Sequence, residues 1–181
     1  MFRLAPFVLT PTIDRRDNVP KDAASTRSNI LSAAVQTLQR GGLEGFTLEA
    51  IARRAGVVKG LILYHYASRA RLLRAAASQI AASRSAAIER ALASAPGAGA
   101  LDACWEELRR QAEDGTARAW LSLCAAGLID RSARNTNFED AARDAVIDGS
   151  AIALAAGVPL ADAKDAYDAL WLSLLEVTQK S

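Results

Sequence analysis

The sequence predicts an all-α fold, and three observations lead to this prediction. Alanine and leucine dominate the 181 residues, whereas the β-branched and aromatic residues that favour strands are sparse. Apolar residues recur every three or four positions, as on one face of a helix, and no segment alternates apolar and polar residues as a half-buried strand does. Hydrophobic residues make up 51% of the chain, enough for a packed core. We expect an N-terminal three-helix unit followed by a C-terminal helical bundle.

Residues 1–24 are expected to form a flexible arm. Their apolar stretch is broken by Pro6 and Pro11 and is too short for the core of a signal peptide. No run approaches the ~18 consecutive apolar residues of a membrane span. Cys104 and Cys124 lack the spacing and the histidine neighbours of a metal site, so we expect no disulfide framework, metal or cofactor. These features predict a cytoplasmic protein.

A helix-turn-helix is predicted within residues 25–72. Apolar periodicity places a first helix from Ser25 or Thr26 to the glycine pair that follows residue 40, and two shorter helices at about 47–55 and 59–66. Thr47 can cap the first of these short helices, with Glu49 near its positive end, and Val58, Ile62 and Tyr66 are expected on one face of the second.

The connection between the two short helices is tight, because only three residues, beginning with Gly56, separate them. Two short helices joined by a tight turn that contains glycine are typical of this motif.

The remaining residues, 73–181, are expected to continue as helices. Ser68 can cap a long helix that reaches about Ala95, where the sequence PGAG interrupts the pattern. Further helices are predicted at about 101–113, 117–131, 136–156 and 160–179. In the last of these, one apolar stripe faces either the core or a partner. It consists of Leu160, Ala163, Tyr167, Leu170, Trp171, Leu174 and Val177.

Charge is distributed unevenly along the chain. Residues 1–74 carry 12 basic and 5 acidic side chains, a balance of +7, whereas the remainder carries 10 basic and 15 acidic ones, a balance of −5. A basic front half is expected to meet a polyanion. Solvated surfaces also show such asymmetry by chance, so the charge pattern alone does not establish the partner.

The third predicted helix has the residue types that a DNA-reading helix needs. Lys59 can donate to guanine or phosphate, Gly60 allows close approach, and Leu61 and Leu63 can touch thymine methyl groups. Four further side chains can donate to phosphates, namely Thr47, Tyr64, His65 and Arg69. His65 has the alternative of a purely structural role, and Arg53 and Arg54 are equally well explained as a solvated face.

Residues 26–73 resemble the DNA-binding domain of the TetR family of repressors. The matching positions are Arg27, Ile30, Leu31, Ala33, Ala34, Thr47, Ile51, Ala52, Ala55, Gly56, Val57, Gly60, Tyr64, His65, Ser68, Leu72 and Leu73. The resemblance assigns Lys59, Gly60, Leu61 and Leu63 to bases and Thr47, Tyr64, His65 and Arg69 to phosphates. Three positions depart from the family pattern: Val58 replaces a capping serine, Leu63 replaces a tyrosine, and Glu49 replaces an arginine that reads a base in some members.

The resemblance also implies a homodimer on a near-palindromic operator, with a small-molecule pocket in residues 73–181. Large or soft apolar side chains of the central helices could line that pocket, which suggests an apolar or aromatic ligand. The candidates are Trp105, Trp120, Cys124, Leu128 and Phe138. Each of them is explained as well by ordinary core packing.

A sequence-specific transcriptional regulator, a repressor released by its ligand, is therefore the expected function. A helix-turn-helix protein that binds no ligand is the first alternative, and a helical-bundle enzyme is the second. The chain has a single histidine, no Glu-x-x-His pair and no glycine-rich phosphate loop, which disfavours the enzyme.

Overall fold

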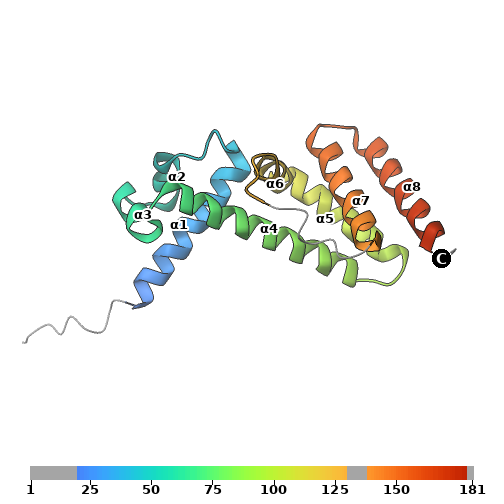
Figure 1. The fold of residues 1–181 in the computed structure, drawn as a ribbon, viewed down its shortest axis with the longest axis horizontal. Coiled ribbons are helices and arrows are strands. Elements are labelled where there is room, and N and C mark those ends of the chain that lie inside the picture. Colours follow the sequence, from blue (N-terminus) through green and yellow to red (C-terminus); the bar gives the residue numbers. More distant parts are fainter. Residues whose placement is uncertain (1–19, 130–137, 179–181) are drawn as a thin grey trace, which may run out of the picture.

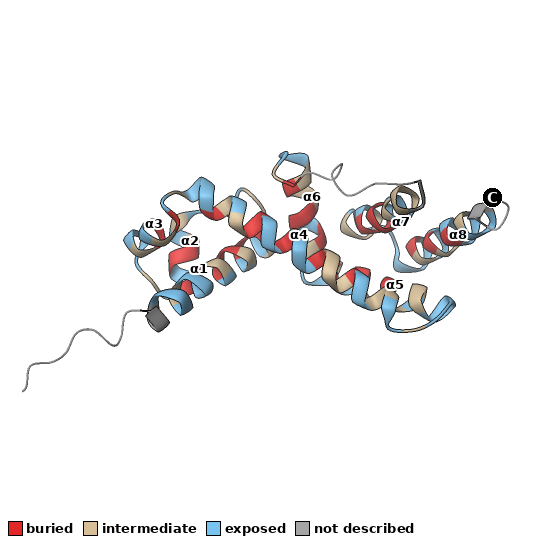
Figure 2. Cartoon of the chain, turned by 60° about the horizontal axis from the view of Figure 1, so that its bottom comes forward, coloured by how far each residue is buried: buried red, intermediate tan, exposed pale blue. Residues whose placement is uncertain are grey.

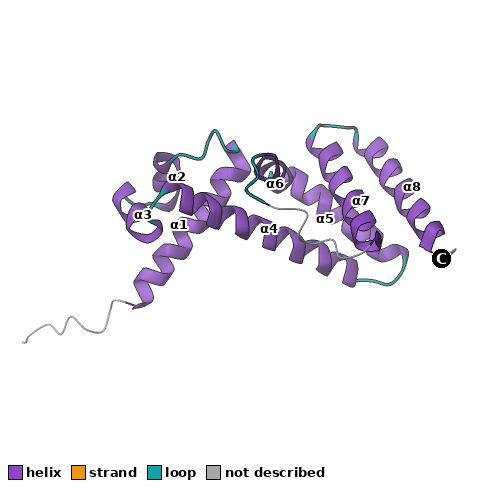
Figure 3. Ribbon diagram, in the orientation of Figure 1, coloured by secondary structure: helices purple, strands orange, loops and turns teal. Residues whose placement is uncertain are grey.

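The computed structural model describes residues 20–129 and 138–178, and every regular element in these two ranges is an α-helix (Figures 1 and 3). The all-α prediction is therefore confirmed. The helices are α1 (Pro20–Gly41), α2 (Leu48–Ala55), α3 (Lys59–Tyr66), α4 (Arg69–Ala93), α5 (Ala98–Glu113), α6 (Thr116–Ala125), α7 (Phe138–Ala155) and α8 (Leu160–Thr178).

A first hydrophobic core holds α1, α2 and α3 together at one end of the molecule. Ile30 of α1, Ile51 of α2 and Ile62 of α3 are completely buried in it, and so is Phe46 from the loop before α2. Figure 2 shows buried residues on the sides of these helices that face one another. Each helix thus buries one apolar stripe, as its periodicity predicts.

α4 links this first core to a second one. The helix has 25 residues and is therefore about 37 Å long. Leu72 and Ile80 of α4 lie in the first core, whereas Ile88 lies in the second. The expected domain boundary after residue 72 falls inside this continuous helix, and the division into 25–72 and 73–181 stays a prediction.

The second core is built mainly by α5, α7 and α8, which lie at the other end of α4 (Figure 1). α6 contributes to both cores, with Ala117 in the second and Trp120 and Leu123 in the first. Its N-terminus meets the end of α1, where the amide of Gln39 donates to the Thr116 hydroxyl over 2.8 Å. The two ends of the molecule are therefore joined by α6 as well as by α4.

Two helix ends differ from the sequence prediction by five residues or more. α1 begins at Pro20 rather than Ser25, so part of the expected arm is helical, and residues 1–19 lie outside the described residues. A proline in the first turn lacks only an N–H that has no intrahelical partner there. α6 ends at Ala125 rather than residue 131 because Gly127 takes a φ of +68°, which stops the helix.

The apolar residues of α8 do not form one stripe. Ala163, Tyr167 and Trp171 are buried in the second core, and Leu174 packs against it. Other leucines of the same helix point into solvent, namely Leu160, Leu170, Leu172 and Leu175. The core reading therefore applies to the buried set, whereas a partner-facing role of the exposed leucines stays a prediction.

Candidate DNA-binding site

A left-handed glycine shapes the turn between α2 and α3. Gly56 has φ +68° and ψ +31°, and its N–H donates to the carbonyl of Ala52. This conformation disfavours residues that carry a Cβ, so α2 stops here and α3 begins three residues later. Val58 precedes α3 in an extended conformation and is 73% exposed, so the expectation that it shares a buried face with Ile62 is wrong. Helical spacing does not apply to a residue outside the helix.

α1 fastens the C-terminal ends of both short helices. The amide of Asn29 donates to the carbonyl of Ala55 over 2.9 Å, and the Arg27 guanidinium donates to the carbonyl of His65 over 2.8 Å. The Tyr66 hydroxyl returns a hydrogen bond to the Arg27 carbonyl over 2.9 Å, and the guanidinium stacks 4.5 Å from the centre of the Tyr66 ring. Burial raises the pKa of Tyr66, which keeps this donor protonated. These contacts set the position of α3 on the domain.

One face of α3 is buried and the other is open. Ile62 and Tyr66 lie in the first core, whereas Lys59, Gly60 and Tyr64 are exposed, Tyr64 by 81%. No protein atom lies within 4 Å of a Cβ built on Gly60. Leu63, a second apolar side chain on this face, is 43% exposed, and Leu61 is partly buried at its edge. Together these side chains form an open surface on the side of α3 opposite the first core.

Lys59, at the start of α3, is paired with an acid on α2. The Lys59 ammonium lies 2.6 Å from a carboxylate oxygen of Glu49. Hydrogen bonding from Lys59 lowers the pKa of the Glu49 carboxyl, so this carboxyl is ionised at neutral pH. Sequence reasoning placed Glu49 at the positive end of α2 and missed this pair, because the two residues are ten positions apart on different helices.

The candidate phosphate contacts border this surface. Thr47 caps α2 by accepting from the N–H of Ala50 over 3.1 Å, which confirms the predicted cap and leaves its own hydroxyl proton able to donate. Arg69 donates through Nε to the carbonyl of Phe46 over 2.8 Å and so also holds the loop before α2. The His65 ring is partly buried, 5.2 Å from that of Tyr64 in an edge-to-face arrangement.

Residues 30–76 match the family model of bacterial regulatory proteins of the tetR family, and this range contains the whole helix-turn-helix described above. This part of the chain is therefore similar to the DNA-binding domain of the TetR family. The predicted family is confirmed over these residues, and none of the curated proteins matches the sequence.

Solved structures share the fold over most of the chain, beyond the residues that match the family model. The multidrug binding protein EbrR, crystallised with imidazole, is 23% identical, with 92% of this chain and 97% of that one covered at a TM-score of 0.57. A gamma-butyrolactone receptor, an ArpA-like protein, is 22% identical, with 86% and 88% covered at 0.52. A protein from Rhodococcus sp. described as a TetR-family regulator is 23% identical, with 85% and 98% covered at 0.50.

The candidate ligand residues of the C-terminal helices do not come together. Trp105 belongs to the second core and Trp120 to the first, and Cys124 and Leu128 pack against the first. The side chain of Phe138 lies outside the described residues. The set therefore does not line one site in this structure, and its role in ligand binding stays a prediction.

Sequence reasoning missed two clusters in this part of the TetR-like fold. Trp105, Tyr167 and Trp171 form a cluster of tilted and edge-to-face rings with centres 5.2 and 6.1 Å apart, and the Tyr167 hydroxyl donates to the carbonyl of Leu101 over 2.8 Å. Burial raises the pKa of Tyr167 far above its ordinary value. The spacing of four between Tyr167 and Trp171 is the one local signal that could have identified part of this cluster.

The second cluster is a buried ion pair between α4 and α7. Arg84 and Asp148 are 4% and 10% exposed, and their side chains approach to 3.1 Å. The Arg84 guanidinium also lies 3.8 Å from the centre of the Trp120 ring on α6. Because a buried charge is costly unless it is paired, this contact ties three helices together in one arrangement.

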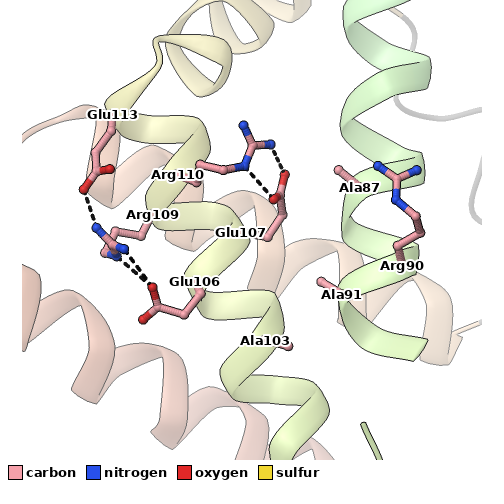
Figure 4. A pocket seen from close by; sticks show the side chains of 9 residues that line it. All are labelled: Ala87, Arg90, Ala91, Ala103, Glu106, Glu107, Arg109, Arg110 and Glu113. Carbon is pink, nitrogen blue, oxygen red and sulfur yellow. Dashed lines mark hydrogen bonds and ion pairs between the residues drawn. The ribbon is translucent and has the colours of Figure 1, made fainter. Parts of the chain in front are cut away.

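A groove of about 730 Å³ lies between α4 and α5 (Figure 4). Arg90 of α4 and the ion-paired Glu107 and Arg110 of α5 border it. It does not resemble the expected pocket, because charged side chains line it and none of the candidate ligand residues does. Among the described residues no His, Cys, Asp and Glu cluster could hold a metal ion, and no helix is long and apolar enough to cross a membrane.

Proposed function

We propose that this protein is a sequence-specific, DNA-binding transcriptional regulator that inserts α3 into the major groove. The observation that carries the proposal is the open face of α3, which bears Lys59, Gly60, Leu63 and Tyr64 on a helix whose other face is anchored by Ile62 and Tyr66. A helix held this way from behind presents its outer side chains to base edges. The positive balance of the N-terminal part of the chain supports a polyanionic partner.

The individual contacts follow from the chemistry of the side chains. Bases are assigned to Lys59, Gly60, Leu61 and Leu63, and phosphates to Thr47, Tyr64, His65 and Arg69. The phosphate contacts would set the register of the protein on the duplex, and the base contacts would select the sequence. Arg69 holds the loop before α2 through Nε, so its terminal guanidinium nitrogens would contact the phosphate. Thr47 caps α2 as an acceptor, so its hydroxyl proton would be the donor to DNA.

The regulator acts as a homodimer on a near-palindromic operator in the cytoplasm. One short recognition helix reads too few base pairs to be selective, whereas two copies related by a two-fold axis reach major grooves about 34–36 Å apart or a multiple of that. The exposed leucines of α8, together with Ile152 of α7 at 48% exposure, supply apolar surface for the partner.

A small ligand releases the repressor from its operator in this proposal. EbrR is described as a multidrug binding protein and the ArpA-like protein as a gamma-butyrolactone receptor, which supports a small, apolar or aromatic ligand for this fold. The second candidate is a DNA-binding regulator without a ligand. Its support is the division of Trp105 and Trp120 between two packed cores.

Selection of bound sequences from random DNA tests the proposal. The full-length protein should enrich one near-palindromic sequence, and log affinity should fall with log salt by about 0.9 per neutralised phosphate. Tyr64→Ala should weaken binding to all sequences alike, and Lys59→Ala should cost roughly 1–3 kcal/mol at one position. Arg118→Ala on α6 removes one positive charge, as Lys59→Ala does, but it should change neither the affinity for DNA nor the sequence preference. A flat salt response with no enriched sequence would refute DNA binding.

Addition of candidate ligands separates the two versions of the proposal. Apolar and aromatic compounds can be titrated into the protein–operator complex while fluorescence anisotropy follows release of the DNA. Release by at least one compound, with a matching rise in the melting temperature of the free protein, supports ligand control. Failure of a broad chemical library to do either would favour the regulator without a ligand.

A further inference from the structure

Glu49 is an unexpected residue on this surface. It is the one acidic residue in the sequence from Leu48 to Tyr66, which contains the whole helix-turn-helix. Phosphates would repel it, and the N-terminus of α2 already has Thr47 as its cap. Stability does not explain it either, because an ion pair as exposed as that of Glu49 and Lys59, at 63% and 55%, adds little to the free energy of unfolding.

The geometry of the pair matches a base edge. Lys59 is the first residue of α3 and shares its open face with Gly60 and Leu63, so the ammonium and the carboxylate lie at the end of the reading surface. Their nearest atoms, a nitrogen donor and an oxygen acceptor, are 2.6 Å apart. In a C·G pair the amino group of cytosine and O6 of guanine are hydrogen-bonded partners, so they lie about 2.9 Å apart in the major groove.

We propose that Glu49 and Lys59 act as one specificity-determining unit that reads a single C·G base pair. This inference rests on the proposed function. The carboxylate accepts a hydrogen bond from the cytosine amino group, and the ammonium donates to O6 and N7 of the paired guanine. Each charge keeps the other in place before DNA is bound, so the unit meets the base pair preformed.

The other base pairs fit this unit less well. Adenine also has an amino group, but its N7 lies beside it as an acceptor and repels the carboxylate. Thymine offers the ammonium one acceptor, O4, beside a methyl group, whereas guanine offers two. If guanine or thymine faces Glu49 instead, as in a G·C or T·A pair, the carboxylate meets an acceptor. The unit therefore prefers C·G in one orientation.

Selection from random DNA followed by competition among the four base pairs at each operator position tests the unit. Glu49→Gln keeps the size of the side chain but has both a donor and an acceptor. It should reduce the preference for C·G at one position by at least about fivefold and leave the other positions unchanged. Glu44→Gln, which makes the same change at an exposed residue of the loop before α2, should keep the wild-type preferences.

Lys59→Ala should relax the same position as Glu49→Gln, because the two residues read one base pair. Glu49→Ala should raise affinity for non-specific DNA, since one repulsive charge is lost, while the ratio of specific to non-specific binding falls. Glu49 is exposed, so neither Glu49→Gln nor Glu49→Ala creates a buried cavity. The melting temperature checks that the variants are folded.

Three results would overturn the inference. The Glu49 variants could keep the wild-type preference at every position, they could change affinity for all sequences by the same factor, or Lys59→Ala could relax a different position. A wild-type protein that selects no sequence would instead refute the proposed function itself. If the wild-type protein selects a sequence but the Glu49 variants keep the same preference, only this inference is refuted and the proposed function stands.

Discussion

Gly60 distinguishes what the fold needs from what DNA needs. It lies in the first turn of α3, is exposed, and does not have the positive φ that requires glycine. A Cβ added there meets no protein atom within 4 Å. Glycine inside a helix is less favourable than alanine by about 0.5–1 kcal/mol. Gly60→Ala should therefore stabilise the free protein, toward the lower end of that range because the position is close to the helix N-terminus.

The same substitution should weaken operator binding. If the backbone of α3 approaches the base edges closely at Gly60, the new methyl group occupies space that DNA fills in the complex. Overpacking of a well-fitted contact costs typically 1–3 kcal/mol, which corresponds to roughly five- to 150-fold in affinity. Stability and affinity should thus move in opposite directions in one variant.

Urea unfolding followed by circular dichroism measures the first effect, and fluorescence anisotropy with labelled operator measures the second. Gly41→Ala is a matched control, because Gly41 is also exposed, lies at the end of a helix and has open space around it. It is 14 residues, about 21 Å along α1, from Arg27, which contacts α3. It should change stability without changing affinity. Unchanged operator affinity in Gly60→Ala would refute a close approach of DNA at this position.

Three other variants test the helical scaffold and the proposed dimer interface. Arg27→Ala removes a hydrogen bond and a stacked cation from the end of α3, so the free energy of unfolding in urea should fall by about 1–2 kcal/mol. Operator affinity should fall as well, and unchanged values would contradict the anchoring role of Arg27. Gly115→Ala combines a φ of +83° with a Cβ that clashes with the Gln39 carbonyl oxygen of α1, and it should destabilise the protein clearly more than Gly127→Ala, which has the positive φ without the clash. Equal losses would show that the contact relaxes. The double variant Leu170→Lys and Leu172→Lys should sediment as a monomer with its helix content retained, and a protein that stays dimeric would place the interface away from α8.

Local signals were sufficient to predict the helix-turn-helix. Thr47 and Ser68 cap α2 and α4 as expected, because a hydroxyl one residue before a helix satisfies N–H groups that the helix leaves open. Gly56 ends α2 in the left-handed conformation that its residue type allows. The end of α6 shows that such a signal can be ambiguous, because Gly127 lies inside the predicted helix 117–131 yet takes a positive φ and follows the helix end.

Contacts between distant residues could not be predicted from the sequence. Arg84 and Asp148 are 64 positions apart, and nothing near either of them indicates that both are buried. Trp105 and Trp120 look equivalent as large apolar residues of central helices, yet the packing of α6 places them in different cores. Periodicity identifies which side of a helix is apolar, but it does not identify the neighbour that covers it.

The residues that hold α3 in place are different from those on its open face, so the open face can change without loss of the fold. The position of the helix depends on Ile62 and Tyr66, whereas Lys59 and Tyr64 point outward and contribute little to folding. Substitutions at such exposed positions usually change stability by less than about 0.5 kcal/mol. A duplicated copy of this gene could therefore acquire a new operator through a few outward-facing changes, without passing through an unstable intermediate. The same property makes these positions suitable for building DNA-binding proteins of different specificity on one scaffold.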